Sequence, residues 1–285
     1  MRARIQDFRD KVWDYYRENG RDLEWRHEPT PYQVVVSELM LQQTQVVRVA
    51  ERYPRWMKRF PSFEQLAKAS IAEVLEEWQG MGYNRRGLFL HRIAQAVMSE
   101  NGGILPSDPA ELVKLPGIGI NTAGSIAAFA YNLPVVFIET NIRRVFIHEF
   151  FGEQTLSSRA QPRDLRGDFS STVEMTEKVS DTQLMPLIAE AIDHEHPREW
   201  YYALMDYGSY LAKTVVNPNR RSKHHTTQSK FEGSKRQIRG EVLRQLMAGS
   251  RQTFEIDDAR LEVVLADMLK EGFIVQNGET YALAE

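Results

Sequence analysis

The sequence of 285 residues contains no cysteine. Disulfides, cysteine nucleophiles, thiolate zinc sites and cysteine-ligated iron–sulfur clusters are therefore excluded. No apolar run approaches the roughly 20 residues that a membrane helix needs. The first 16 residues are charged throughout and lack the apolar core of a secretory signal. These absences predict a cytoplasmic protein without a membrane partner.

The chain also lacks a large excess of charge of one sign, because its formal net charge is only −3. Residues 211–240 differ from this balance, with eight basic side chains against one acid. A local basic stretch attracts a phosphate backbone, but a solvated linker has the same composition. His224 and His225 are adjacent and would point in different directions, so we expect no metal site there.

Strand-like patterns are scarce before residue 234, whereas helical periodicity is nearly continuous. Ile5, Phe8 and Val12, for example, recur at the spacing of one helix face. The patterns predict helices over 3–18, 31–49, 45–59, 63–70, 71–79, 85–101, 108–115, 121–131, 141–151, 182–194 and 197–213. We therefore expect an all-α domain over 1–215, followed by a polar, basic linker over 216–234.

The last fifty residues have a different pattern. We expect a helix over 235–248, a short strand over 253–256 and a second helix over 258–271 with Asp257 or Asp258 as its cap. Gly272 would end that helix, and Asn277-Gly278 predicts a hairpin turn. This order is typical of a small winged-helix-like α+β domain over 235–285. Such domains bind duplex DNA in some proteins and other proteins elsewhere.

The most specific motif is a helix–hairpin–helix in residues 109–131. Pro116 would stop the first helix, Gly117 and Gly119 would permit positive φ in the turn, and Asn121 or Thr122 would cap the second helix. Backbone N–H groups at such a turn can bind one DNA phosphate without a basic side chain. The alternative is a helical hairpin whose glycines serve packing alone.

Two carboxylates occupy unusual positions. Glu38 lies in an apolar helix, where burial would raise its pKa and suit it to donate a proton. Glu139 follows an apolar run and begins the next helix, whose N-terminus would favour its anion. Each residue taken singly fits a structural acid equally well. Two carboxyls with diverging pKa values would instead suit an acid and an electrostatic stabiliser.

Four segments occur together in an order that carries a resemblance to a known family. They are RDLEWR at 21–26, SELMLQQTQV at 37–46, QGMGY at 79–83 and LPGIG at 115–119. They resemble the adenine DNA glycosylase branch of the helix–hairpin–helix (HhH-GPD) superfamily, which also contains endonuclease III. The resemblance spans about residues 5–213. It implies two helical lobes around a flipped base, a six-helix barrel over about 27–135 and a second lobe from 1–26 and 136–215.

The resemblance also implies roles for single residues. Glu38 would be the general acid, Glu139 would stabilise an oxocarbenium-like sugar, and Asn141 would support the pair. Gln43 would fill the gap left by the flipped base. The base pocket would contain Trp25, Arg26 and Asn121. Further DNA contacts would come from Gln42, Met81, Tyr83, Leu115, Gly117, Gly119, Asn121, Thr122, Arg220, Arg221 and Lys223. A monovalent cation at the hairpin phosphate site is the one cofactor that the resemblance allows.

The sequence departs from the family in four places. Position 139 holds Glu where the family has Asp, which moves the carboxylate by ~1.5 Å. A misplacement of about 1 Å can cost about 100-fold in rate. Asn121 stands where bifunctional relatives have a lysine, so no Schiff base can form there. The basic segment 213–230 replaces the iron–sulfur loop that follows ALMDYG at 203–208, and the small C-terminal domain replaces a larger reader of 8-oxoguanine.

The predicted function is therefore that of a monofunctional DNA N-glycosylase in base excision repair. It would act as a monomer on duplex DNA in the nucleoid and release adenine opposite guanine or 8-oxoguanine. One alternative is a glycosylase for thymine or uracil opposite guanine, or for a damaged base. Another is a catalytically inactive relative that binds distorted DNA as a regulator.

Overall fold

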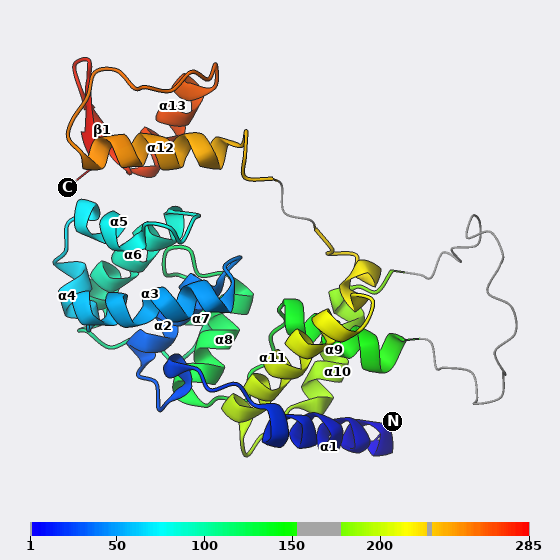
Figure 1. Cartoon of the computed structure of the whole chain (residues 1–285). Helices are drawn as coiled ribbons and strands as arrows, with labels where there is room; N and C mark the ends of the chain where they lie inside the picture. The colour runs from blue at the N-terminus through cyan, green and yellow to red at the C-terminus, as the bar shows by residue number, and fades with distance from the viewer. Residues whose placement is uncertain (1, 153–177, 227–229, 285) are drawn as a thin grey trace, which may run out of the picture. The chain divides into compact units, whose positions relative to one another are not determined.

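The computed structural model describes residues 2–152, 178–226 and 230–284 (Figure 1). The chain forms two compact units, each made of two separate stretches. Unit 1 comprises Met1–Arg21 and Asn132–Thr227, and unit 2 comprises Asp22–Tyr131 and Gln228–Glu285. Among the described residues, no helix has the length and apolar character needed to cross a membrane.

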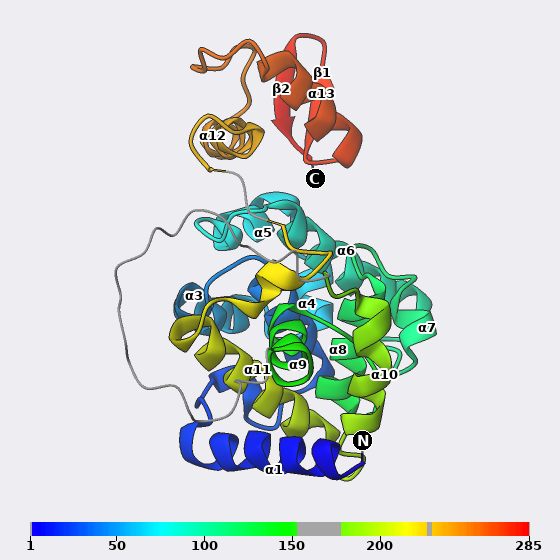
Figure 2. The same ribbon diagram turned by 90° about the vertical axis from the view of Figure 1, so that its right-hand side faces the viewer.

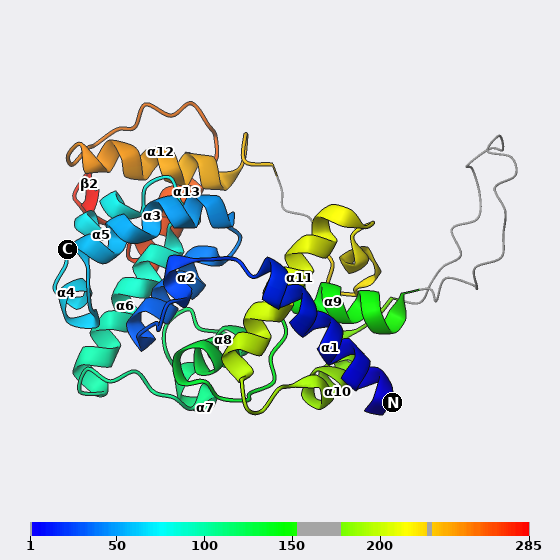
Figure 3. The ribbon, with the colours of Figure 1, turned by 60° about the horizontal axis from the view of Figure 1, so that its bottom comes forward.

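The described part of unit 1 is a bundle of four helices and a short 3-10 helix. Its elements are α1 (Arg2–Asn19), α9 (Thr140–Phe151), α10 (Asp181–Ala191), α11 (Pro197–Thr214) and η2 (Pro218–Arg221). Helix α11 lies beside both α9 and α1, as Figures 1 and 3 show. The predicted apolar face of α1 is buried here, and the Phe8 ring meets Phe146 and Trp200 edge-on at 5.1 and 5.9 Å between centroids.

The helical part of unit 2 surrounds α2 (Pro31–Leu41). A capping box between Thr30 and Gln33 begins this helix, and α2 contacts α3, α6 and α8. Its apolar residues, Val34 to Val36 among them, are almost fully buried. The other elements are η1 (Glu24–Arg26), α3 (Val46–Arg59), α4 (Phe63–Ala67), α5 (Ile71–Trp78), α6 (Arg85–Glu100), α7 (Pro109–Leu112) and α8 (Ile120–Tyr131).

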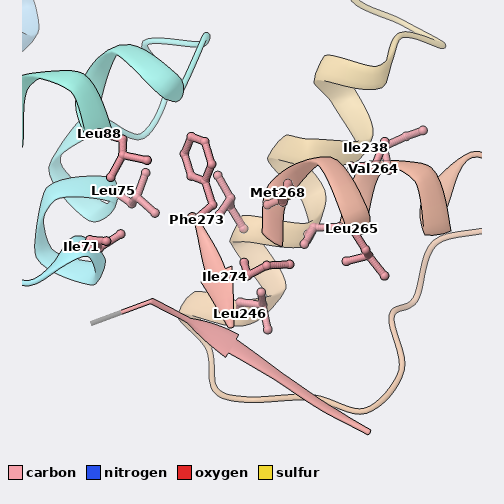
Figure 4. Packing of buried hydrophobic residues seen from close by; sticks show 12 residues of the cluster. Ile71, Leu75, Leu88, Ile238, Leu246, Val264, Leu265, Met268, Phe273 and Ile274 are labelled. Carbon is pink, nitrogen blue, oxygen red and sulfur yellow. The ribbon is translucent and has the colours of Figure 1, made fainter. Parts of the chain in front are cut away.

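The C-terminal part of unit 2 contains α12 (Lys235–Met247), α13 (Leu261–Glu271) and an antiparallel hairpin of β1 (Ile274–Asn277) and β2 (Thr280–Leu283) (Figure 2). Its apolar core continues into the preceding helices. Phe273 and Ile274 share one buried cluster with Ile71, Leu75 and Leu88 of α5 and α6 (Figure 4). The C-terminal part therefore packs against the helical part of the same unit.

Several predicted elements differ in the structure. The helix expected over 31–49 ends at Leu41, because a turn in which Gln43 has φ +53° separates α2 from α3. Residues 253–256 form no strand, and the nearby pairing is a single bridge between Arg251 and Tyr281. Helix α13 begins only at Leu261. Asp258 is thus not its cap and instead binds the Arg260 side chain at 2.6 Å.

The end of α13 and the hairpin follow the prediction closely. Gly272 adopts φ +73° and ends the helix, as the sequence predicted. The hairpin forms, but its turn lies one residue further along the chain. Asn277 pairs with Thr280, so Gly278 and Glu279 make the turn.

Candidate functional site

Glu38 lies in the second half of α2, in unit 2. The neighbouring Ser37, Leu39 and Met40 are buried, whereas Glu38 itself is half-buried. The helix thus anchors this carboxyl on a rigid apolar element while leaving part of it accessible.

A buried arginine fixes the end of this helix. The Arg86 guanidinium donates to the carbonyl oxygens of Leu39 and Met40 at 2.8 and 3.0 Å, and to that of Gln42. These are carbonyls that the last turn of a helix leaves without intrahelical partners. Arg86 also donates to the carbonyl oxygens of Met81 and Gly82 at 3.2 and 3.0 Å. One side chain therefore joins the helix of Glu38 to the 81–82 turn.

Sequence reasoning missed Arg86. Burial lowers its pKa to about 10, so it remains a cation at neutral pH. The only available signal was a basic residue on an otherwise apolar helix face.

Glu139 caps α9 in unit 1. Its Oε1 accepts the backbone N–H groups of Asn141 and Ile142 at 2.6 and 2.8 Å, and its Oε2 accepts Asn141 Nδ2 at 3.3 Å. Burial raises the pKa of this carboxyl, whereas the N–H donors and Arg144 lower it. The N–H groups at the helix N-terminus favour the anion, as the sequence predicted, but burial has the larger effect on the pKa.

Arg144 supports Asn141 from the next turn of α9. Its Nη1 donates to Asn141 Oδ1 at 2.6 Å and to the Gly208 carbonyl at 2.8 Å. A Cβ atom at Gly208 would lie 2.6 Å from the Asn141 Cβ, so only glycine lets α11 approach this closely. Asp206, also on α11, accepts Arg21 Nε at 2.6 Å.

The helix–hairpin–helix turn forms between α7 and α8. Gly117 has φ +75°, and a Cβ there would lie 2.2 Å from a ring carbon of Phe89. Gly119 has no positive φ, and a Cβ there would meet nothing within 4 Å. The two glycines therefore differ. Gly117 is required by the fold, whereas the positive φ predicted for Gly119 is wrong and its backbone leaves space beside it.

Asn121 and Thr122 do not cap α8 as predicted. The helix begins at Ile120, which places both residues in its first turn. Asn121 is exposed, and Thr122 Oγ1 accepts Gln42 Nε2 at 3.4 Å.

The other predicted DNA contacts divide into accessible and buried side chains. Gln43 is exposed and Tyr83 is half-buried, and both have positive φ, +53° and +48°. Met81 and Leu115 are only 2% and 7% exposed, so the predicted contacts by their side chains are corrected to core positions. Trp25 is likewise buried and packs on Tyr53 at 5.5 Å between centroids, whereas Arg26 beside it is half-buried.

The expected linker over 216–234 is shorter in the structure. Buried Asn219 donates to the Thr140 carbonyl at 2.9 Å, and Ser222 forms a bridge with Val179. Arg220 and Lys223 are exposed, but Arg221 is half-buried and donates to the Phe151 carbonyl. The described residues 216–226 thus belong to unit 1, and two of the three predicted DNA-binding side chains, Arg220 and Lys223, make no structural contact there.

Within the described ranges, no group of three or more His, Asp or Glu side chains could hold a metal ion. His224 lies 3.8 Å from Asp181, and no third candidate ligand accompanies them among these residues.

The glycine-bearing hairpin and the helical fold define the class of protein. Residues 36–167 match the HhH-GPD superfamily of base excision DNA repair proteins. The chain is 34% identical to the adenine DNA glycosylase of Mycobacterium tuberculosis (strain H37Rv), over 87% of this chain and 80% of that protein. It is 32% identical to the adenine DNA glycosylase of Mycolicibacterium smegmatis, over 96% and 95% of the two chains. The chain belongs to the adenine DNA glycosylase family.

Solved structures agree on the fold. A thermostable thymine-DNA glycosylase superposes with a TM-score of 0.61 at 20% identity, over 78% of this chain and 94% of that one. Endonuclease III in a trapped covalent DNA complex gives 0.58 at 16% identity, over 76% and 90%. At these identities the likeness concerns the fold alone.

Proposed function

We propose that the protein is a monofunctional DNA N-glycosylase that releases adenine opposite guanine or 8-oxoguanine in duplex DNA. The observation that carries the proposal is the capped carboxylate of Glu139. Its family position holds an acid, and Asn141 and Arg144 fix that acid in one orientation. An acid fixed in this way suits the stabilisation of positive charge on a sugar.

In the proposed reaction the bond between C1′ and the purine breaks as Glu38 gives a proton to the departing base. The sugar then carries positive charge, which the Glu139 carboxylate stabilises. Water adds to C1′ and loses a proton, so the products are free adenine and an abasic site. No amine acts from position 121, because Asn121 carries an amide that cannot form a Schiff base.

Duplex DNA would contact two features of unit 2. The exposed backbone around Gly117 and Gly119 suits one phosphate, with a monovalent cation as a possible bridging ion. Gln43 and Tyr83, on the turns after α2 and α5, would face the base stack, and a side chain inserted there offsets the cost of flipping a base. Gln42, which contacts Thr122, would position this region.

A substrate panel tests the proposal. Duplexes carrying A·8-oxoG, A·G, T·G, U·G or hypoxanthine·T are incubated with excess protein, and alkali then cleaves the abasic sites. We expect cleavage of the two adenine duplexes only, no strand scission without alkali, and no covalent complex after borohydride. Preferential release of thymine or uracil would overturn the base assignment. Efficient borohydride trapping would show that an amine elsewhere in the chain acts as nucleophile.

A further inference from the structure

A cavity of about 850 Å³ lies within unit 2, between α12 and the turns that carry Gln43 and Tyr83. Its lining includes four arginines and no acidic residue. The arginines are Arg48, Arg236, Arg239 and Arg244. A cavity with this lining suits an anion.

The four arginines differ in how their charge is used. Arg239 and Arg244 pair with Glu271 and Glu241, each at 2.5 Å. Arg48 is exposed on α3, and no carboxylate of the described residues lies within ion-pair distance of it. Arg48 therefore brings positive charge to the cavity that is available to a ligand.

Arg236 links α12 to the turn after α5. Its Nη1 donates to the Tyr83 hydroxyl at 2.6 Å, and its guanidinium lies 5.0 Å from the centre of the same ring. Tyr83 has φ +48°, a conformation that costs free energy for a residue with a side chain. Gln43, on the same cavity wall, has φ +53°. Strained backbone of this kind concentrates at ligand-binding sites, and Arg236 holds one of these residues in place.

A glycine on α12 lines the cavity and leaves space in it. Gly240 lies in the interior of α12, where glycine is less favourable than alanine. A Cβ there would meet no atom within 4 Å, so the fold itself gives no packing reason for glycine. Phe231, which also lines the cavity, is 57% exposed and offers an aromatic face.

We propose that this cavity binds one nucleotide of the duplex that the enzyme acts on. Its phosphate would lie at Arg48 and Arg236, and its base or sugar would pack on Phe231 above Gly240. Arginine forms strong bonds with phosphate, and aromatic rings stack on nucleotide bases. The C-terminal part would thereby contribute α12 to DNA binding. This inference rests on the proposed glycosylase function only in taking DNA as the ligand.

The first test neutralises the two arginines. An R48Q/R236Q variant of the full chain is titrated with a duplex that carries a tetrahydrofuran abasic analogue opposite guanine, over a range of salt concentrations. Each phosphate contact adds about 0.9 to the slope of log affinity against log salt concentration. One contact therefore makes binding about fivefold weaker in about 1 M salt than in about 0.15 M salt. We expect the slope to fall by about two units. A K58Q/K270Q variant loses the same charge at exposed positions outside the cavity and should bind as the wild type does.

The second test fills the cavity without changing charge. Gly240→Met should leave the melting temperature unchanged or higher, because it improves helix propensity. It should nevertheless weaken DNA binding about tenfold or more, since it occupies the nucleotide's space. Loss of Arg236 could also displace Tyr83, to which it donates a hydrogen bond. The single variant R48Q avoids this effect, because the Arg48 side chain bonds no other described residue.

Outcomes of the two tests separate the inference from the proposed function. Wild-type affinity and salt slope in R48Q, together with wild-type affinity in G240M, would overturn the nucleotide site. An equal loss of affinity in K58Q/K270Q would mean that general charge alone accounts for the effect, and would overturn it as well. If the wild type binds the abasic duplex but cleaves no adenine duplex, the proposed function fails while the site stands.

Discussion

Glu38 and Glu139 are the two acids of the predicted pair, and their surroundings differ. Glu38 lies inside a helix, half-buried among apolar neighbours. Glu139 precedes a helix and accepts three N–H bonds, two from the backbone and one from Asn141. Three donors thus fix the Glu139 carboxyl in one orientation, whereas Glu38 has no such role at a helix terminus.

The two acids nevertheless share one feature. A buried arginine fixes the helix of each, Arg86 for α2 and Arg144 for α9. Both arginines donate to oxygen atoms that are not carboxylates and so fix position, and the Arg144 charge in addition lowers the pKa of Glu139. In both sites an arginine holds the helix that carries the acid. The sites differ in the hydrogen-bond donors that surround the carboxyl group itself.

The largest effect is expected at Glu38. Replacing it with glutamine keeps its size but removes the proton, so single-turnover release of adenine should fall by about 100- to 10,000-fold. Affinity for an abasic-analogue duplex is the control and should stay near the wild-type value. A wild-type rate in this variant would remove Glu38 from the mechanism.

The next effect is expected at Glu139. Glu139→Gln keeps an oxygen for the two backbone N–H groups but removes the charge, and should slow the same step by about 100- to 1,000-fold. Glu139→Asp is the matched variant, because it restores the acid that the family has. If the extra methylene displaces the charge, E139D should release adenine faster than the wild type. Equal rates for all three proteins would mean that this carboxylate only caps α9.

A change in pH dependence should sharpen the contrast. Burial raises the pKa of Glu139, and the side-chain amide of Asn141 donates to its Oε2 at 3.3 Å. Asn141→Leu removes a donor to the charged form, so the pKa should rise further. Because release needs the ionised carboxylate, the acidic limb of the rate profile should move to higher pH. The alkaline limb, which reports the proton donor, should not move, and a shift of both limbs would contradict the assignment.

The smallest effect concerns how unit 1 contacts DNA. Arg220 and Lys223 are exposed, whereas Arg221 holds the Phe151 carbonyl. Replacing Arg220 and Lys223 with glutamine should lower the salt slope of binding by about two units for every duplex. The base preference should not change, because phosphate contacts position and base contacts specify.

Arg221→Gln is the matched comparison for that pair. It removes the same kind of charge but should mainly lower the melting temperature, since it leaves a carbonyl without its donor. An unchanged slope in the R220Q/K223Q variant would mean that the exposed part of this segment is only solvated.

Local features of the structure were predictable where short-range rules decide them. Gly272 ends α13 with positive φ, and Gly117 turns the hairpin, both as predicted. Each depends on steric or hydrogen-bonding preferences within a few residues. Prediction failed where a side chain had two possible environments. Met81 and Trp25 fitted a DNA-facing surface as well as a core, and burial placed both in the core.

Periodicity, turn chemistry and motif order are local properties, so they were enough to predict the helical order, the hairpin and the positions of Glu38 and Glu139. Other contacts depend on the fold. Arg86 joins the end of α2 to the 81–82 turn, Arg144 bonds the Gly208 carbonyl, and α12 closes a cavity with Arg48. Those contacts join residues far apart in the chain. A buried cationic side chain donates to the carbonyl or hydroxyl oxygens that packing brings near it. The fold decides which oxygen atoms these are.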